Sequence, residues 1–501
     1  MSAGLHNMEE FDVIVVGAGI AGISAGYHLQ RDCPDKTYAI LEGRAAIGGT
    51  WDLFRYPGVR SDSDMFTLGF AFKPWLGRDS IADAPDIVAY VREAAREFGI
   101  DGHIRFKHRV VRADWSSQEA RWIVDVEHEG RAKRFKCKFL HFASGYYDYA
   151  KGYLPEFKGV ERFKGRIVHP QHWPEDLDYA GKRVVVIGSG ATAVTLVPAM
   201  AEKAAHVVML QRSPTYMVSL PRQHKLGNWL RRTLPARLAY DVTRAVQIAW
   251  SQFFYNLARS RPEPTKKRLL SLVRAQLPGF DVEKHLTPRY NPWEQRLCLV
   301  PDNDMFSAIR EGKASIVTDT IDTFTEDGVQ VSSGEVVKAD IVVTATGLNL
   351  QMLGGVEVAV DGAKVETNEH YTYKGCMLSD VPNLAFVFGY TNASWTLRAD
   401  LVNAYVCRLV NYLSEYGLGS ATPHYSGVHE EIPFVDFSSG YFQRVAHLLP
   451  KQTADAPWRQ NQSYARDLKD LRFAPVEDGV LEFKRAPAPA APKLALARAA
   501  S

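Results

Sequence analysis

Two glycine-rich segments of the chain have the spacing needed to bind the pyrophosphate of a dinucleotide. The first segment, residues 17–22 (GAGIAG), follows an apolar run at 13–16 and precedes a helical apolar pattern. In such a strand–turn–helix unit, Gly17 permits the tight turn, Gly19 lets the backbone approach the pyrophosphate, and Gly22 lets the helix pack closely on the strand. The amino end of the helix also attracts the anion. We therefore predict a dinucleotide site here.

An acidic residue after the next strand indicates which nucleotide this first site holds. The apolar strand predicted at residues 38–41 ends at Glu42. A carboxylate at this place can accept hydrogen bonds from both ribose hydroxyls, and it would repel a 2′-phosphate. The first site is therefore predicted to bind FAD or NAD.

The second glycine-rich segment, residues 188–193 (GSGATA), predicts a different nucleotide. Gly188, Gly190 and Ala193 occupy its three motif positions after a strand at 182–187, but the next strand, 207–210, is followed by Gln211, Arg212 and Ser213 instead of an acid. The planar guanidinium of Arg212 can bind a phosphate through two hydrogen bonds, and Ser213 can add a hydroxyl donor. These residues favour NADPH. The alternative is that Arg212 is only a solvated charge at a strand end.

Composition is consistent with a large protein that contains no disulfide framework. The chain has 501 residues, 46% of them hydrophobic, so more than one core is expected. A net charge of +3 says little about partners. The 5 cysteines include no CxxC pair, which predicts a reduced, cytoplasmic protein. The first ten residues lack the apolar core of a signal peptide, no long apolar run predicts a membrane span, and the 15 histidines show no metal-binding spacing.

The alternation of strands and helices predicts an α/β fold with two Rossmann-like dinucleotide-binding domains and a helical insert. Two similar strand ends, Ala143-Ser144-Gly145 and Ala345-Thr346-Gly347, are candidate crossings between the domains. Both domains are then discontinuous. The predicted ranges are 1–147 and 348–485 for the FAD-binding domain, 148–216 and 293–347 for the NADPH-binding domain, 217–292 for the insert, and 486–501 for a disordered tail of low complexity.

The insert combines an apolar helical stripe with an excess of positive charge. The stripe consists of Leu238, Val242, Val246, Phe253 and Leu257. The basic residues between 222 and 274 are Arg222, Lys225, Arg231, Arg232, Arg237, Arg244, Arg259, Arg261, Lys266, Lys267, Arg268 and Arg274, against Asp241 and Glu263. This pattern is compatible with peripheral contact to an anionic membrane. We favour the plainer interpretation that the stripe packs on the protein. Nucleic-acid binding is disfavoured because no corresponding motif is present.

Two further segments carry a resemblance to a known family. Phe163, Gly165, His169, Trp173 and Pro174 match the FxGxxxHxxxWP signature of Baeyer–Villiger monooxygenases, the class B flavoprotein monooxygenases. Residues 48–62 match the longer second signature of that family, which ends in Asp62. Within the family, the chain looks most like the ethionamide-activating branch of mycobacteria and their relatives. The segments that carry this closer similarity are 55–58, 169–174, 291–301 and 389–395.

The resemblance implies an activity and its cofactors. Enzymes of this family hold FAD noncovalently, reduce it with NADPH and react it with O2 to a flavin C4a-peroxide. They insert one oxygen atom into ketones to give esters or lactones, and they oxidise thioether or thioamide sulfur. The expected partners are therefore O2 and a small ketone or sulfide.

The resemblance also assigns roles to individual residues. Arg296 corresponds to the active-site arginine and Asp62 to the carboxylate that positions it, although an isolated structural ion pair is the plainer interpretation. Many family members have lysine where this chain has Gln295. Gly49, Thr50, Trp51 and Asp62 belong to the flavin side. Phe163, Gly165, His169 and Trp173 are expected to act as a conformational hinge, and Trp395 to shape the substrate pocket.

Two other functions remain open on sequence alone. One is a sulfur- or nitrogen-oxygenating flavin monooxygenase without ketone activity, for which a different signature would be expected at His169 and Trp173. The other is an oxidase or electron-transfer flavoprotein that docks at membranes through the insert, which would not need a cation at position 296. The physiological substrate and the oligomeric state are not predicted.

Overall fold

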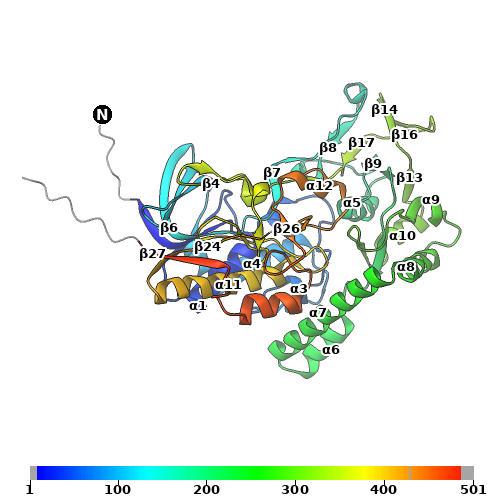
Figure 1. Cartoon of the computed structure of the whole chain (residues 1–501). Coiled ribbons are helices and arrows are strands. Elements are labelled where there is room, and N and C mark those ends of the chain that lie inside the picture. Colours follow the sequence, from blue (N-terminus) through cyan, green and yellow to red (C-terminus); the bar gives the residue numbers. More distant parts are fainter. Residues whose placement is uncertain (1–7, 428–429, 487–501) are drawn as a thin grey trace, which may run out of the picture.

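The computed structural model describes residues 8–427 and 430–486, which form two lobes and a projecting helical insert (Figure 1). The larger lobe contains a nine-stranded sheet and the smaller one a five-stranded sheet. The α/β fold class predicted from the sequence is therefore confirmed. Beyond Ala486 the predicted disordered tail lies outside the described residues.

The nine-stranded sheet contains β1, the strand that directly precedes the first glycine segment. Its order is β20-β19-β4-β5-β6-β1-β2-β3, with β23 also paired to β6. β1 runs parallel to both β2 and β6, and its residues 13–16 are buried because both faces of the sheet are covered. The strands are β1 (Glu9–Val16), β2 (Tyr38–Leu41), β3 (Ile104–Arg105), β4 (His108–Ser116), β5 (Arg121–His128), β6 (Arg131–Phe142), β19 (Glu357–Val360), β20 (Ala363–Lys364) and β23 (Leu384–Phe386).

Helices from both halves of the chain complete this lobe. α1 (Ile20–Asp32) packs against α11 (Trp395–Glu415), and α4 (Ala84–Glu97) lies beside α1. Most of α11 is buried in the same hydrophobic core as α1. The smaller elements of the lobe are α2 (Thr50–Leu53), α3 (Met65–Leu68), α12 (Gly440–Gln443), α13 (Tyr464–Asp467), β21 (Thr372–Tyr373), β22 (Met377–Leu378), β24 (Leu418–Pro423), β25 (Glu431–Ile432), β26 (Gln452–Thr453) and β27 (Leu481–Arg485).

The five-stranded sheet carries the second glycine segment. All its strands are parallel, in the order β13-β10-β9-β17-β8. The helix α5 (Ala191–Ala201) follows β9 directly, as a dinucleotide motif requires. The strands are β8 (Arg166–Val168), β9 (Arg183–Ile187), β10 (His206–Gln211), β13 (Ala314–Thr318) and β17 (Ile341–Thr344), and a smaller antiparallel sheet is formed by β14 (Ile321–Thr325), β15 (Gly328–Val331) and β16 (Val336–Lys338).

Two strands connect the lobes side by side. β7 (Tyr147–Gly152) pairs in the antiparallel sense with β18 (Leu348–Leu350). They follow directly after the two strand ends at 143–145 and 345–347 that we selected as candidate crossings. The residue limits of the two domains stay a prediction.

The insert begins differently from our expectation. Its first residues form a strand, β11 (Met217–Leu220), which pairs with β12 (Cys298–Pro301). The helical part starts only afterwards, with α6 (Lys225–Thr233), α7 (Ala236–Ser260), α8 (Pro262–Gln276) and α9 (Val282–Leu286). The pairing with β12 explains the difference, because a partner from a distant part of the chain is not visible in local periodicity. α10 (Asp304–Arg310) follows β12.

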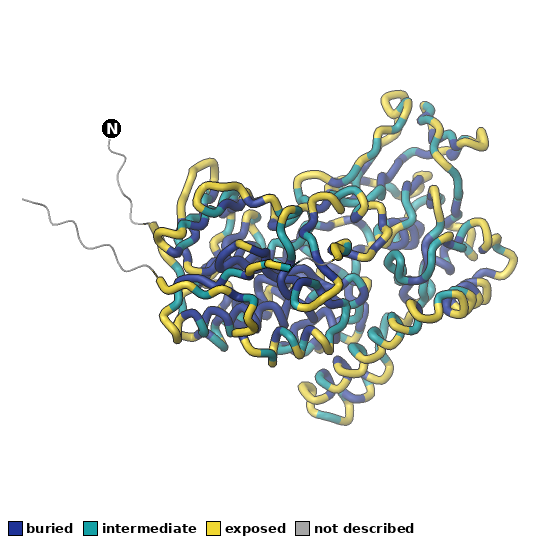
Figure 2. The backbone as a smooth tube through the Cα atoms, viewed as in Figure 1, coloured by how far each residue is buried: buried dark blue, intermediate teal, exposed yellow. Residues whose placement is uncertain are grey.

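The prediction that the apolar stripe of the insert packs on the protein is wrong. Leu238, Val242, Val246 and Phe253 are exposed, and Leu257 is only half-buried. Figure 2 shows the α6–α7 region as largely exposed. The buried residues of α7 are instead Ala239, Tyr240, Thr243, Arg244 and Ala258. Periodicity identified a helix face correctly, but it cannot tell what covers that face.

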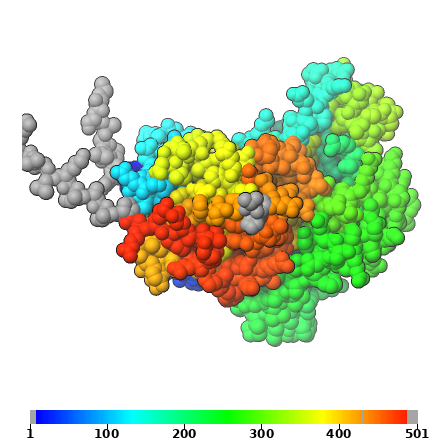
Figure 3. Space-filling view, viewed as in Figure 1, coloured from blue at the N-terminus to red at the C-terminus, as the bar shows by residue number. Residues whose placement is uncertain are grey.

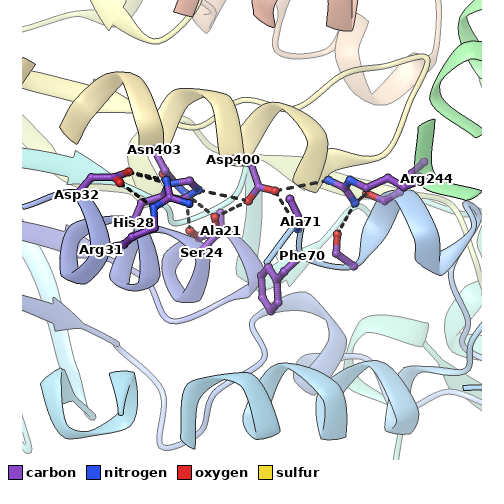
Figure 4. A network of polar contacts seen from close by, with 12 residues as sticks. Ala21, Ser24, His28, Arg31, Asp32, Phe70, Ala71, Arg244, Asp400 and Asn403 are labelled. Carbon is purple, nitrogen blue, oxygen red and sulfur yellow. Dashed lines mark hydrogen bonds and ion pairs between the residues drawn. The ribbon is translucent and has the colours of Figure 1, made fainter. Parts of the chain in front are cut away.

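Buried polar contacts attach α7 to the larger lobe (Figure 4). The guanidinium of Arg244 donates to the carbonyl oxygens of Phe66 (2.7 Å) and Gly69 (2.8 Å), and it lies 3.5 Å from a carboxylate oxygen of Asp400. The other oxygen of Asp400 accepts a 2.6 Å hydrogen bond from Ser24 on α1. Because these groups are buried, their mutual hydrogen bonds hold the orientation of α7. None of the described helices is long and apolar enough to cross a membrane.

Candidate active site

Residues of both lobes line one cavity of about 640 Å³. From the larger lobe, Gly17, Gly19 and Glu42 contribute to its wall. From the smaller lobe come the amino-terminal residues of α5 and the segment that contains Arg296. Residues 49–51, Asp62 and Trp395 also line it. The cavity therefore brings together the first glycine segment and the candidate catalytic residues.

The first glycine segment has the geometry of a phosphate cradle. Gly17 has a φ of +102°, and a Cβ atom on Gly22 would lie 1.9 Å from the Gly17 carbonyl oxygen. A Cβ on Gly19 would meet no protein atom closer than 3.6 Å, because it would point into the cavity. Thus two of the glycines are required by the protein itself, whereas Gly19 keeps space open for a ligand.

Glu42 lies at the end of β2 with both carboxylate oxygens oriented. The Ala18 N–H donates to one oxygen at 2.7 Å, and the Arg44 N–H donates to the other at 2.7 Å. Each oxygen retains a free lone pair. The buried carboxylate lines the cavity, so it can accept further hydrogen bonds from ribose hydroxyls.

The segment after Gly49 forms the next part of the wall. Thr50 and Trp51 start α2, and the Thr50 hydroxyl is 2.9 Å from that of Tyr149. Burial raises the pKa of Tyr149 to about 12, so its hydroxyl stays protonated. Behind this wall, buried Asp52 pairs with three arginines, which are Arg44, Arg55 and Arg92. Sequence reasoning did not single out Asp52, although its place inside the second signature could have indicated it.

Arg296 and Asp62 form an ion pair with two contacts. The distances are 2.8 Å from Nε to one carboxylate oxygen and 3.0 Å from a terminal nitrogen to the other. Burial opposes the charged form of Arg296, but Asp62 and the neighbouring tyrosines together outweigh burial and raise the pKa of the guanidinium above its ordinary value. The cavity thus holds a permanent cation whose plane is fixed by a carboxylate.

Tyrosines surround this cation, and sequence reasoning missed them. The hydroxyls of Tyr146 and Tyr147 are 3.0 Å apart, and Trp395 stacks on Tyr146 with ring centroids 4.9 Å apart. Burial raises the pKa of Tyr146, Tyr147 and Tyr441 above the usual value, so all three remain neutral donors. Tyr146 and Tyr147 directly follow the strand end at 143–145, and this position in the sequence could have identified them as candidate site residues.

The second glycine segment lies at the carboxyl ends of β9 and β10. Gly188 has a φ of +137°, and a Cβ there would lie 2.3 Å from the Ala345 carbonyl oxygen. Gly190 starts α5 beside open space. The Ser189 hydroxyl donates to the Ser213 carbonyl oxygen at 2.9 Å, which joins the loop to the end of β10. Arg212 and Ser213 are exposed there, and Ala193 is buried.

The second glycine segment reaches the shared cavity only through the helix that follows it. Ala191, Thr192 and Thr195 of α5 line the cavity, but Gly188, Gly190, Arg212 and Ser213 do not. The phosphate-binding residues proposed for the second nucleotide therefore lie outside the cavity, at one end of α5.

The signature residues lie behind the cavity, at the connection between the lobes. A Cβ on Gly152 would lie 2.1 Å from the His169 ring, which therefore packs on the backbone of β7. Burial lowers the pKa of His169, against the opposing influence of the Tyr153 and Gly347 backbones. Gly165 permits close contact with the Asp340 carbonyl and the Phe163 ring. Trp173 packs on the core of the smaller lobe.

The cavity holds the first nucleotide-type glycine loop and a fixed cation, and a second such loop lies outside it at the start of α5. This arrangement defines a class of protein, the enzymes that catalyse a redox reaction between two dinucleotide cofactors. Residues 80–385 match the family described as flavin-binding monooxygenase-like, and residues 15–75 match an NAD(P)-binding Rossmann-like domain. The chain therefore belongs to the flavin-binding monooxygenase-like family, and it is a flavin-dependent monooxygenase. The resemblance predicted from the sequence is confirmed.

Individual relatives cover nearly the whole chain. The FAD-containing monooxygenase EthA of Mycolicibacterium smegmatis is 55% identical over 95% of this chain and 98% of its own length. EthA of Mycobacterium tuberculosis is 53% identical over 96% and 99%, respectively. Among solved structures, an oxidised steroid monooxygenase bound to NADP has a TM-score of 0.69, with 24% identity over 83% of this chain and 87% of that chain. The solved structure supports the fold. The two EthA relatives support the closer similarity within the family that segments 55–58, 169–174, 291–301 and 389–395 indicated.

Proposed function

We propose that this protein uses FAD, NADPH and O2 to insert one oxygen atom into ketones and to oxidise thioether or thioamide sulfur. With a ketone as substrate, the reaction consumes the ketone, O2, NADPH and a proton, and it forms an ester or lactone, NADP+ and water. The observation that carries this proposal is the Arg296–Asp62 pair in the cavity that also contains the first glycine segment.

The residues of the larger lobe fit FAD. Gly19 leaves space for the pyrophosphate beside the amino end of α1, and the oriented carboxylate of Glu42 suits the ribose hydroxyls. Gly49, Thr50, Trp51 and Asp62 are proposed to lie along the rest of the cofactor. FAD, when bound, supplies the reduced ring that activates O2. No covalent attachment is proposed.

The residues of the smaller lobe fit NADPH. Gly188, Gly190 and Ala193 would accommodate its pyrophosphate at the start of α5. The exposed Arg212 guanidinium, which has no recorded acidic partner among the described residues, is available for the 2′-phosphate, with Ser213 beside it. The related steroid monooxygenase structure is bound to NADP.

Arg296 would act on charge that develops on oxygen. A permanent cation in a confined cavity stabilises a negative oxygen in the transition state, and its worth grows as water is excluded. Asp62 would orient the guanidinium, and the neutral hydroxyls of Tyr146 and Tyr147 could donate hydrogen bonds without adding negative charge. We propose Trp395 as a wall of the substrate pocket because it lines the cavity beside Tyr146.

His169 and its signature neighbours would act as a hinge. The His169 ring packs on β7, one of the two connecting strands, and does not line the cavity. A residue at that place can influence the relative position of the lobes without touching substrate. Phe163, Gly165 and Trp173 would support the same connection.

A second candidate function is oxygenation of sulfur or nitrogen without ketone activity. The experiment that separates the two uses purified protein, NADPH and 18O2 with phenylacetone and methyl phenyl sulfide, followed by mass spectrometry. Labelled ester would support the proposal. Labelled sulfoxide without ester would favour the second candidate, and hydrogen peroxide without labelled organic product would contradict both.

The proposal extends to the location of the protein. The free cysteines, all of them buried, are compatible with a reducing, cytoplasmic compartment. We further propose a peripheral contact of the basic insert with the inner face of the cell membrane.

A further inference from the structure

Helices α6 and α7 of the insert form a helical hairpin that exposes several large apolar side chains. We call this set of residues the hairpin face. It consists of Leu226, Trp229, Leu238, Val242, Val246, Trp250 and Phe253. The exposed fraction of each of these residues lies between 38% and 59%. In Figure 3 the lower part of the green insert projects at the bottom of the molecule, below the red and orange segments of the larger lobe.

The spacing places the α7 members on one side of the helix. Leu238, Val242, Val246, Trp250 and Phe253 follow at intervals of four or three residues, and exposed Ala245 and Ala249 lie between them. No charged residue occurs between positions 245 and 258. The rings of Trp250 and Phe253 are 5.9 Å apart. Soluble proteins rarely expose a stripe of this kind without a partner.

The opposite side of α7 is fixed, so the stripe cannot turn inward. Arg244 is held by the carbonyls of Phe66 and Gly69, and the Tyr240 hydroxyl donates to the Phe70 carbonyl at 2.9 Å. On α6, Arg231 donates to the Leu76 carbonyl at 2.6 Å. This bond brings another exposed apolar residue, Leu76, to the neighbourhood of α6.

Positive charge flanks both ends of α7. Lys225 and Arg232 precede it on α6, while Arg261, Lys267 and Arg268 follow it, and all of them are exposed. Among residues 8–427 and 430–486, no acidic partner is recorded for any of these cations. The acid on α7 itself, Asp241, already pairs with Arg237 at 2.8 Å. The surroundings of the stripe therefore carry uncompensated positive charge.

We infer that the hairpin face docks on the surface of an anionic lipid bilayer. The apolar stripe and its tryptophans would enter the boundary between headgroups and acyl chains, and the flanking cations would contact lipid phosphates. A second copy of the chain is a poorer occupant. In a two-fold dimer through this face the same basic residues would meet one another, and like charges oppose association.

This inference refines the membrane contact proposed above, and it does not depend on the oxygenation chemistry. The test uses the full-length, FAD-loaded protein and sedimentation with phosphatidylcholine vesicles, with or without phosphatidylglycerol. We expect binding to the vesicles that contain phosphatidylglycerol, and release at high salt. Sulfoxidation of methyl phenyl sulfide without vesicles is measured in parallel, so that failure of the reaction and failure of lipid binding are distinguished.

Two double variants separate the apolar and the electrostatic contributions. Trp250→Ser with Phe253→Ser should weaken vesicle binding by about ten-fold or more, because two ring side chains no longer leave water. Lys267→Gln with Arg268→Gln should weaken binding only to the anionic vesicles. Phe473→Ser removes an even more exposed ring from the larger lobe, and it should have no effect on vesicle binding. Retained flavin absorbance shows that each variant is folded.

Three results would overturn the inference. The first is that the wild-type protein does not bind the anionic vesicles. The second is that the Trp250 and Phe253 double variant binds them as tightly as the wild type does. The third is that light scattering shows this double variant dissociating from a dimer to a monomer while vesicle binding is unchanged, which would identify the face as a contact between copies.

Discussion

Arg296 and Asp62 are 234 positions apart in the chain, yet they form a two-contact ion pair in the cavity between the lobes. Asp62 belongs to a loop of the larger lobe, whereas Arg296 lies just before β12, beside the smaller lobe. Their pairing therefore links the two nucleotide-binding halves of the molecule. It also leaves a cation of fixed orientation where the reaction is proposed to occur.

Removal of this cation should separate cofactor oxidation from oxygenation. In Arg296→Ala we expect FAD to remain bound and NADPH to be oxidised, while ester formation from phenylacetone falls by roughly 100-fold or more. Arg296→Lys keeps a charge but loses the planar two-contact geometry, so its rate of ester formation should lie between those of the wild type and Arg296→Ala. Arg289→Ala, an exposed arginine nearby in sequence, serves as the control. Unchanged ester formation in Arg296→Ala would remove this residue from the mechanism.

Arg212 should determine the preference for NADPH over NADH. Loss of its hydrogen bonds to a 2′-phosphate, each worth about 1.5–3 kcal/mol, should raise the KM for NADPH roughly 10- to 100-fold in Arg212→Ala and leave that for NADH almost unchanged. Steady-state kinetics with both nucleotides measures this ratio. Arg166→Ala changes an exposed arginine at the opposite end of the same sheet, and it should not alter the ratio. Equal effects on both nucleotides would exclude a 2′-phosphate contact.

Gly19→Ala should weaken FAD binding without unfolding the protein. The added methyl group meets no protein atom closer than 3.6 Å, and Gly19 has a φ of −75° that alanine adopts readily. It would occupy the space proposed for the pyrophosphate. Loss of one hydrogen bond to the charged group predicts a dissociation constant raised about 10- to 100-fold. Fluorescence titration of the apoprotein with FAD measures it, and Gly102→Ala, whose Cβ lies in open space, is the matched control. An unchanged constant would contradict the assigned cradle.

The network of Figure 4 predicts a dependence of stability on pH. Burial alone would favour neutral His28, but Asp32 and Asp400 reverse this and raise its pKa above the ordinary value of 6.5, against a smaller opposing effect of Arg31. A raised pKa means that the folded state holds the proton more tightly. The contribution is therefore complete below about pH 6.5 and disappears as the pH rises through the raised pKa.

The corresponding experiment compares His28→Gln with the wild type. The loss of thermal stability caused by the substitution should be largest in mildly acidic buffer and should shrink toward alkaline pH. His447→Gln changes an exposed histidine and should give a small difference at every pH. A destabilisation by His28→Gln that is independent of pH would show that packing, not protonation, is responsible. The pKa of Asp400 is lowered in the folded protein, so its carboxylate has the opposite pH dependence. The stability that this carboxylate contributes is lost only as the pH falls through the lowered pKa.

Trp395 should influence which substrates are accepted. Its ring stacks on Tyr146 at the wall of the cavity. Trp395→Ala would enlarge this region, and we expect the ratio of kcat/KM for a bulky aryl sulfide over methyl phenyl sulfide to rise roughly 10-fold or more. Trp395→Phe keeps the stacking and should change the ratio much less. If Trp395→Ala changes both substrates equally, the residue is not part of the substrate pocket.

The sequence by itself determined the parts of the molecule whose geometry is local. Each glycine segment is contained within one strand–turn–helix unit, so the residue types and their spacing are sufficient to predict that unit. Glu42 and Arg212 could be identified in the same way, because each directly follows the next strand of its sheet. The family resemblance rested on short continuous segments for the same reason.

Only the tertiary structure decided which distant residues meet. The ring of Tyr146, Tyr147 and Tyr441 around Arg296 is assembled from separate segments, and nothing in the spacing of those segments predicts it. The pairing of β11 with β12 depends equally on a distant partner. On α7, periodicity predicted an apolar face, but its exposure follows from Tyr240 and Arg244 docking the opposite side on the larger lobe. Helix period fixes which residues share a face, whereas the free energy of packing decides which face is covered.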